Sequence, residues 1–356
     1  MDGNIISRVE FIWNQLIRED FDKMAFEKFK KREFIIFSAG YDGKALCHIL
    51  KNENMMIKFF FDNDEKKQGM IFEGIEVKNP NEFLETKDNY VILIANSSNS
   101  AQIRKQLNDK FRNDEIYTYQ EFLLKFTNTS ILEIGPLNNP NFIGKNVKYF
   151  DVLGIEGLRS KAQSWNVDPF GVPQKIDYIS ESGDLSIVDK SFPVVFSSHV
   201  IEHQPNFVEH LIKVEKILQS NGRYIMIIPD KRYCYDHYQE LTLIEDILDS
   251  YYQEAKIHSL KILLSYLRRT HNNARNHWKG NHGDLPKFSI EKVKEIIKQY
   301  KDSNKQYIDA HAWFFTPDSF KNIIEILNQL GLIHLSLIEI SETAPGQLEF
   351  YAILQK

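Results

Sequence analysis

The chain has 356 residues, of which 42% are hydrophobic and 26% charged, a composition typical of folded globular proteins. This length suggests two domains. The net charge of −5 argues against a dedicated nucleic-acid-binding protein. The two cysteines, Cys47 and Cys234, are too few and too far apart for a disulfide framework or a cysteine metal site. We therefore expect a cytoplasmic protein with no signal peptide and no membrane insertion.

The first segment, residues 1–32, is expected to be helical. Val9, Ile12, Trp13 and Leu16 recur at the spacing of one face of an amphipathic helix. We expect this apolar face to pack on the rest of the chain, and a homodimer contact is the alternative.

Residues 33–125 predict a small Rossmann-like domain, because short apolar strands alternate with helical patterns. A Gly40-x-x-Gly43 turn follows the first strand, and Asp62 follows the second, where an acid would bind a ribose. Helix packing alone explains the glycines equally well. The segment resembles the Rossmann-like domains of sugar-modifying enzymes, and this resemblance implies a module that binds a nucleotide sugar.

A second unit is expected at residues 126–356, organised around the apolar strand Ile131–Ile134 and the turn Gly135-Pro136 that ends it. A glycine at the carboxyl end of a parallel strand lets a ligand approach the backbone. The next strand, Val147–Asp151, ends in a carboxylate that suits a ribose diol.

Further apolar strands follow at 192–198 and 223–229, and a final strand pair is expected at 332–353. The ordered motifs ILEIGP, SSHVIEH and GRYIMIIPD resemble class I S-adenosylmethionine-dependent methyltransferases, most closely those of bacterial surface-polysaccharide loci. The resemblance covers residues 126–356. It implies an α/β fold of two successive Rossmann-like domains, S-adenosylmethionine as cofactor, and O-methylation of a sugar hydroxyl in capsule or lipopolysaccharide biosynthesis.

The resemblance also implies which residues contact the cofactor. Asp151 would bind the ribose hydroxyls, and an acid near residue 184 would lie by the adenine, with Glu181 as the alternative to Asp184. The loop after Gly135-Pro136 departs from the commonest glycine-rich form of this motif. The cofactor-binding residues implied are Glu133, Gly135, Pro136, Asp151, Asp184 and Ser198.

An insertion at about 231–310 interrupts the methyltransferase pattern and is predicted to be mostly helical. The polar stretch Arg268–Asp284 contains three histidines and a tryptophan, which favours a wall of the substrate site over a solvated loop. For the aromatic residues that precede this polar stretch, packing within the insertion is the alternative to substrate binding. The predicted substrate-binding residues are Tyr233, Tyr235, Asp236, His237 and His282.

His199, Glu202 and His203 are spaced i, i+3 and i+4, which predicts one shared helix face beside the transferable methyl group. Plant small-RNA 2′-O-methyltransferases bind a divalent metal through a Glu-x-x-Glu-His motif and a later histidine that precedes an aromatic-Thr segment. The present triplet resembles that motif with His199 in place of the first Glu, and His311 resembles the later histidine. This resemblance implies a metal site formed by His199, Glu202, His203 and His311, suited to Mn, Fe, Co, Ni or Zn. The alternatives are a general base among His199, His203 and His311, or a structural cluster.

The leading hypothesis is therefore methyl transfer to a sugar or nucleotide-sugar substrate. The metal-like pattern keeps an RNA 2′-O-methyltransferase as an alternative, although no nucleic-acid partner is expected from the acidic charge balance. An NAD(P)-dependent nucleotide-sugar oxidoreductase working through Gly40 and Asp62 is a second alternative. A non-catalytic binding protein is the third.

Overall fold

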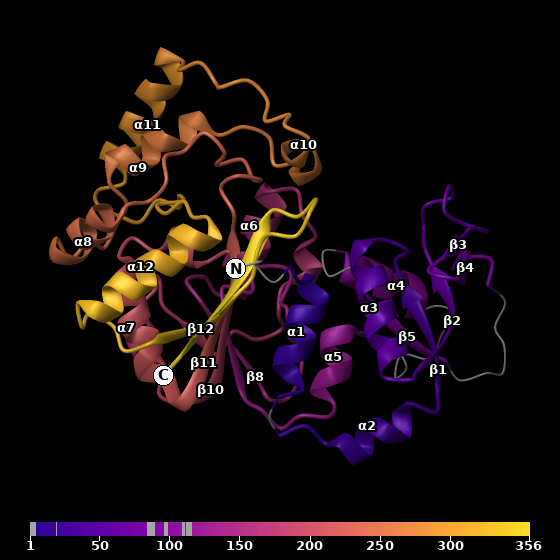
Figure 1. Ribbon diagram of the computed structural model, residues 1–356. Helices are drawn as coiled ribbons and strands as arrows, with labels where there is room; N and C mark the ends of the chain where they lie inside the picture. The colour runs from indigo at the N-terminus through magenta and orange to yellow at the C-terminus, as the bar shows by residue number, and fades with distance from the viewer. Residues whose placement is uncertain (1–4, 19, 84–89, 96–98, 109–110, 112–115) are drawn as a thin grey trace.

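The computed structural model describes residues 5–18, 20–83, 90–95, 99–108, 111 and 116–356. Two sheets of mostly parallel strands lie side by side, with helices α1 (Arg8–Leu16) and α5 (Tyr119–Leu124) between them (Figure 1). The predicted α/β class with two Rossmann-like units is confirmed. Within the described ranges, every helix is too short or too polar to cross a bilayer.

Helix α1 forms as predicted and packs on its own chain. Ser7 caps it by accepting a hydrogen bond from the backbone N–H of Glu10 at 3.1 Å. The apolar positions of α1 are buried, and Phe11 stacks on Tyr351 of the second sheet with 4.7 Å between ring centroids. One hydrophobic core extends from α1 into both sheets, so the two units pack against each other. The residue boundaries between domains stay a prediction.

The N-terminal sheet has the order β3-β4-β2-β1-β5-β6, in which only the β3–β4 pair is antiparallel. Helices of the same unit cover it. Its strands are β1 (Glu33–Phe37), β2 (Met56–Phe61), β3 (Ile71–Phe72), β4 (Ile75–Lys78), β5 (Val91–Ile94) and β6 (Ile116–Thr118), and its helices are α2 (Lys23–Phe29), α3 (Tyr41–Asn52) and α4 (Ser100–Asn108).

The glycine turn of this unit is explained by packing. A Cβ atom on Gly43 would lie 1.8 Å from the carbonyl oxygen of Ser38, so only glycine lets α3 approach the strand. The carboxylate of Asp62 accepts hydrogen bonds from the N–H of Ala39 at 2.8 Å and from Lys67 at 2.9 Å. These contacts account for both residues without a nucleotide, and nucleotide-sugar binding by this unit stays a prediction.

The second sheet has the order β12-β13-β11-β10-β7-β8-β9. β13 runs antiparallel to both of its neighbours, and the other adjacent pairs are parallel. This is the reversed terminal strand pair expected from the sequence. The strands are β7 (Ile131–Ile134), β8 (Val147–Asp151), β9 (Tyr178–Ile179), β10 (Phe192–Ser198), β11 (Leu218–Pro229), β12 (Ser336–Ile340) and β13 (Glu349–Gln355).

The insertion leaves the carboxyl end of β11 and forms a helical layer at that end of the sheet (Figure 1). Thr316 begins the last helix: its side chain accepts a hydrogen bond from the N–H of Ser319, and Pro317 follows at the first helical position. The insertion contains α8 (Ile244–Tyr252), α9 (Leu260–Ser265), α10 (Ala274–Trp278) and α11 (Ile290–Asp302), and the helices that flank the sheet are α6 (Ile155–Ser164), α7 (Phe207–Ile217) and α12 (Pro317–Gln329).

Candidate functional site

A pocket of about 440 Å³ lies at the carboxyl ends of β7, β8 and β10. In an open, mostly parallel sheet, ligands bind at the carboxyl ends of the strands, at the point where the strand order reverses. Many of the residues predicted from the sequence line it, and others do not. The pocket-lining ones are Gly135, Pro136, Asp151, Ser198, His199, His203, Tyr235 and His311. The others are Glu133, Asp184, Glu202, Tyr233, Asp236, His237 and His282.

Gly135 forms the turn at the end of β7. Its φ of +69° lies in the left-handed region that favours glycine. A Cβ atom there would also lie 2.8 Å from Cγ2 of Val200, another pocket residue. The turn therefore brings bare backbone to the pocket wall, as close approach of a ligand requires.

Asp151 lies on the neighbouring strand, at the carboxyl end of β8. Its side chain is buried, and Oδ1 accepts a hydrogen bond from the N–H of Leu153 at 3.1 Å. Burial raises the pKa of this carboxyl above its ordinary value. A carboxylate in this position can accept hydrogen bonds from two adjacent hydroxyls.

Glu133 holds a loop in place and does not line the pocket. Its carboxylate accepts hydrogen bonds from Asn141, through the backbone N–H at 2.7 Å and Nδ2 at 2.9 Å, and from the N–H of Phe142 at 3.0 Å. Burial nevertheless raises the pKa of Glu133 to about 7. The loop that it holds contributes Asn141 to the pocket, so any effect of Glu133 on a cofactor would be indirect.

Of the two candidate acids near the expected adenine, Glu181 lines the pocket and Asp184 does not. The carboxylate of Asp184 caps the short 3₁₀ helix Leu185–Ile187 and pairs with Lys213 at 2.9 Å. The hydrogen bonds from Ser186, followed by Lys213, lower the pKa of Asp184 to about 2. These contacts already use the Asp184 carboxylate.

Alanine substitutions at these two acids are expected to separate their roles. Glu181→Ala should weaken S-adenosylmethionine binding by about 10-fold or more, since a hydrogen bond to a charged group is worth about 1.5–3 kcal/mol. Asp184→Ala should keep the cofactor affinity and lose only helix-cap stability of about 0.5–2 kcal/mol. Isothermal titration calorimetry measures the affinities. A larger loss of cofactor affinity in Asp184→Ala than in Glu181→Ala would assign the adenine contact to Asp184.

An ion-pair network that the sequence did not suggest closes one side of the pocket. Arg8 of α1 reaches Glu349 of β13, with 3.2 Å between Nη1 and Oε1, and also donates a hydrogen bond to Asn141. Oε2 of Glu349 lies 2.9 Å from Nε2 of His199. Burial alone would raise the pKa of Glu349, but Arg8 and His199 lower it to about 2. Burial alone would lower the pKa of His199, but Glu349 and Glu202 raise it above the ordinary value.

The depressed pKa of Glu349 makes a testable contribution to stability. The unfolded chain, with Glu349 at its ordinary pKa of 4.5, binds more protons than the folded chain, where the value is about 2. The contribution is therefore complete above pH 4.5 and lost as the pH falls towards 2, a total of roughly 3 kcal/mol. Urea unfolding at pH 5 and pH 3 should show a smaller acid loss for Glu349→Gln than for the wild type. Equal losses in both proteins would contradict this linkage.

The predicted shared helix face of His199, Glu202 and His203 is wrong for His199. The helix is a short 3₁₀ helix of Ile201–His203, and His199 precedes it with a φ of +55°. The left-handed residue turns the chain sharply after β10, so helical spacing does not apply across it. His199 still lies near Glu202, with 3.6 Å between Nδ1 and Oε1.

Glu202, His203 and His311 come together as predicted from the sequence. One potential ligand atom of each lies within 4.8 Å of the others. Glu202 is completely buried, and neither of its carboxylate oxygens has a hydrogen-bond partner in the described structure. A buried carboxylate without hydrogen-bond partners is costly, and a bound cation would remove that cost.

Two carboxylates orient the histidines of this group. Nδ1 of His203 lies 2.8 Å from Asp309, and Nδ1 of His311 lies 2.6 Å from Asp236. Burial alone would raise the pKa of Asp309, but His203 and then Lys161 hold it well below its usual range. With Nδ1–H donated to a carboxylate, each neutral ring presents the Nε2 lone pair, which is the arrangement found around metal-bound histidines.

The predicted substrate residues fall into two places. Tyr235 lines the pocket, where its hydroxyl lies 2.8 Å from Nε2 of His311. Tyr233 instead stacks on Trp278 of α10, with ring centroids 4.0 Å apart. His237 and His282 stack on each other elsewhere in the insertion. Asp236, also predicted as a substrate residue, instead pairs its carboxylate with His311 and Arg269.

Comparison with known proteins gives one family match, over an N-terminal part of the chain. Residues 30–116 match the family model described as C2185-like, N-terminal. No curated protein matches the chain.

Among solved structures, the chain is similar to S-adenosylmethionine-dependent methyltransferases. One from Clostridium acetobutylicum is 9% identical, with 64% of this chain and 83% of that chain covered and a TM-score of 0.31. The CcbJ methyltransferase from Streptomyces caelestis is 10% identical, with 64% and 88% covered and a TM-score of 0.32. One from Mesorhizobium loti is 11% identical, with 64% and 91% covered and a TM-score of 0.31.

Proposed function

We propose that this chain is an S-adenosylmethionine-dependent O-methyltransferase whose acceptor is a sugar hydroxyl, in a nucleotide sugar or a glycan of a cell-surface polysaccharide. The observation that carries the proposal is the make-up of one pocket. The Gly135 turn and Asp151, which suit the cofactor, line it together with His203 and His311. A methyl donor and an acceptor hydroxyl would meet between these two groups of residues.

The pocket has the chemistry of a sugar site. Trp165, Tyr235 and Tyr307 offer aromatic faces for a sugar ring, and Gln204 offers an amide group for hydroxyls. The formal charge of the chain is −5, which disfavours a phosphate-rich polymer as acceptor.

Methyl transfer from a sulfonium to a hydroxyl needs alignment of sulfur, methyl carbon and acceptor oxygen, and ionisation of the hydroxyl. The Gly135 turn and Asp151 would fix the donor. Tyr235, whose side chain lines the same pocket, would position the acceptor. Because its pKa is raised and it is paired with Glu349, His199 suits a positioning role better than that of a base.

We further propose that Glu202, His203 and His311 hold a divalent transition metal. The unpartnered Glu202 oxygens and the two carboxylate-oriented imidazoles fit such an ion, and N/O donors suit Mn, Fe, Co, Ni or Zn. When bound, a divalent cation at this position would lower the pKa of the acceptor hydroxyl. Asp236 and Asp309 would keep the ligand rings in the required tautomer.

A two-stage experiment tests the proposed function. Calorimetry with the full chain should show S-adenosylmethionine binding and no binding of NAD or NADP. Release of S-adenosylhomocysteine should then be measured with a panel of nucleotide sugars, polysaccharide fragments and short single-stranded RNAs. Turnover with a sugar acceptor supports the proposal. Turnover with RNA alone would replace it by the ribose 2′-O-methyltransferase alternative, and absence of S-adenosylmethionine binding would overturn it.

A further inference from the structure

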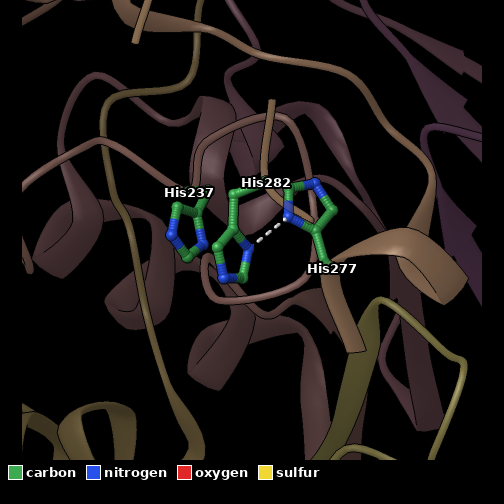
Figure 2. Close-up of side chains that lie close together, drawn as sticks. All are labelled: His237, His277 and His282. Atoms are coloured by element: carbon green, nitrogen blue, oxygen red, sulfur yellow. Dashed lines mark hydrogen bonds between the residues drawn. The ribbon is translucent and has the colours of Figure 1, made fainter. Parts of the chain in front are cut away.

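A second group of histidines lies in the insertion, among residues that do not line the pocket described above. His237 follows β11, His277 lies in α10, and His282 lies in the loop after it. Figure 2 shows the His282 ring between the other two. One potential ligand atom of each histidine lies within 4.8 Å of the others. His277 is buried, and the other two are half-buried.

Backbone carbonyls fix the tautomers of two of these rings. Nε2 of His277 lies 3.0 Å from the carbonyl oxygen of His271, and Nδ1 of His237 lies 2.9 Å from that of Arg232. A carbonyl oxygen only accepts, so each of these nitrogens carries the hydrogen. In the neutral rings, the lone pairs are therefore on Nδ1 of His277 and Nε2 of His237.

The third ring completes the group. Nδ1 of His282 lies 3.0 Å from Nδ1 of His277 (dashed line in Figure 2), so without a metal His282 donates this hydrogen bond. Its ring is stacked on that of His237, with centroids 3.7 Å apart. Moving the His282 proton to Nε2 would free the Nδ1 lone pair beside that of His277, with no change in net charge. Because a lone pair lies in the plane of its ring, the His237 ring must turn out of its stack on His282 before all three can bind one ion.

A nearby fourth histidine is not available as a ligand. Nε2 of His271 lies 3.1 Å from the carbonyl oxygen of Asn281, and Nδ1 accepts a hydrogen bond from the N–H of Asn273 at 3.2 Å. Both ring nitrogens are therefore in use. This makes His271 a matched control for the other three.

We propose that His237, His277 and His282 together bind one divalent transition metal ion, with Zn²⁺ as the reference ion. Three neutral imidazoles suit Zn²⁺ and leave its fourth tetrahedral position for water. Donation of the second ring N–H to a backbone carbonyl is the usual arrangement for a metal-bound histidine.

The ion would fasten the loop of the insertion to the turn after β11. Existing contacts already join these segments: Thr270 donates to the carbonyl of His282 and Tyr238 donates to the carbonyl of Gly283, each at 2.5 Å. The turn also carries Asp236, the partner of His311. This metal therefore has a structural role, and it is independent of the function proposed above.

The test uses the full chain carrying Glu202→Gln, which disables the other candidate metal group. After chelator treatment and dialysis against Zn²⁺, metal content is measured by mass spectrometry. We expect one equivalent in this background, one equivalent with His271→Ala added, and one equivalent fewer with His277→Ala added. Absence of bound Zn²⁺ in the background protein, or the same content with His277→Ala, would overturn the proposal.

Two further measurements protect the test against misfolding. His237→Gln replaces a half-buried ring and should lose the same one equivalent of metal. It takes the place of His277→Ala if that variant fails to fold. Co²⁺ added to the background protein should give the intense visible absorption of a tetrahedral site, which His271→Ala retains. A Co²⁺ spectrum no different from that of the aqueous ion would count against a three-histidine site.

Discussion

Replacing Glu202 by glutamine is expected to lower methyl transfer by roughly 10²- to 10³-fold, because a metal supplies several kcal/mol of charge stabilisation and each 1.36 kcal/mol is tenfold in rate. S-adenosylmethionine affinity should not change, since Glu202 does not line the pocket. Steady-state kinetics and calorimetry on the same preparations measure both quantities. Glu325→Gln, at an exposed ion pair with Lys321 on α12, is the matched control.

Stability gives an independent measurement for the same residue. The metal-free wild type contains a buried carboxylate without hydrogen-bond partners, and the amide of Glu202→Gln removes its charge. Metal-free Glu202→Gln should therefore be at least as stable as the wild type towards urea. A metal-free variant several kcal/mol less stable than the wild type would show that Glu202 has a structural role.

A chelator titration separates the metal hypothesis from the general-base alternative. Complete inhibition that added Mn²⁺ or Co²⁺ reverses supports the metal site. Turnover that ignores the chelator and rises through about pH 6.5 would instead assign proton removal to an imidazole. His203 would then be the first candidate, since its Nδ1 is paired with Asp309 while its Nε2 lies 3.9 Å from Oε1 of Glu202.

Asp151→Ala is expected to weaken S-adenosylmethionine binding by about 10- to 150-fold, the equivalent of a charge-assisted hydrogen bond of about 1.5–3 kcal/mol. The carboxylate ends β8 beside the Gly135 turn, where a ribose diol would lie. Calorimetry with S-adenosylmethionine and S-adenosylhomocysteine should show the same loss for both ligands, because they share the ribose. Asp189→Ala, at a carboxylate bonded to the Tyr178 hydroxyl outside the pocket, is the control. Unchanged affinity in Asp151→Ala would remove this residue from the cofactor site.

The sequence predicts the parts of the fold that depend on local patterns. Buried strands appear as apolar runs, and the Gly135 turn appears as a break directly after one of them. The cap at Thr316 is also marked locally, because a threonine directly before a proline is typical of a helix start. These features place the carboxyl edge of the second sheet, and hence the pocket, before any tertiary contact is known.

Other parts of the site depend on contacts between distant segments. Nothing local marks Arg8 as a pocket residue or Glu349 as its partner, because their pairing brings together the first helix and the last strand. The role of Glu133 was assigned from its position in a motif, whereas the structure shows its oxygens bonded to the loop at Asn141. The left-handed conformation of His199 likewise has no signal in a helical spacing rule.

The pairing of Arg8 with Glu349 has a consequence for the order of folding. These residues are 341 positions apart, so one side of the pocket forms only when the two most distant described elements have met. Contacts of such high sequence separation form slowly, because the chain between them must be ordered first. A cofactor that binds only the closed pocket would draw late intermediates towards the native state by mass action. Refolding in the presence of S-adenosylmethionine should therefore give more native protein than refolding without it.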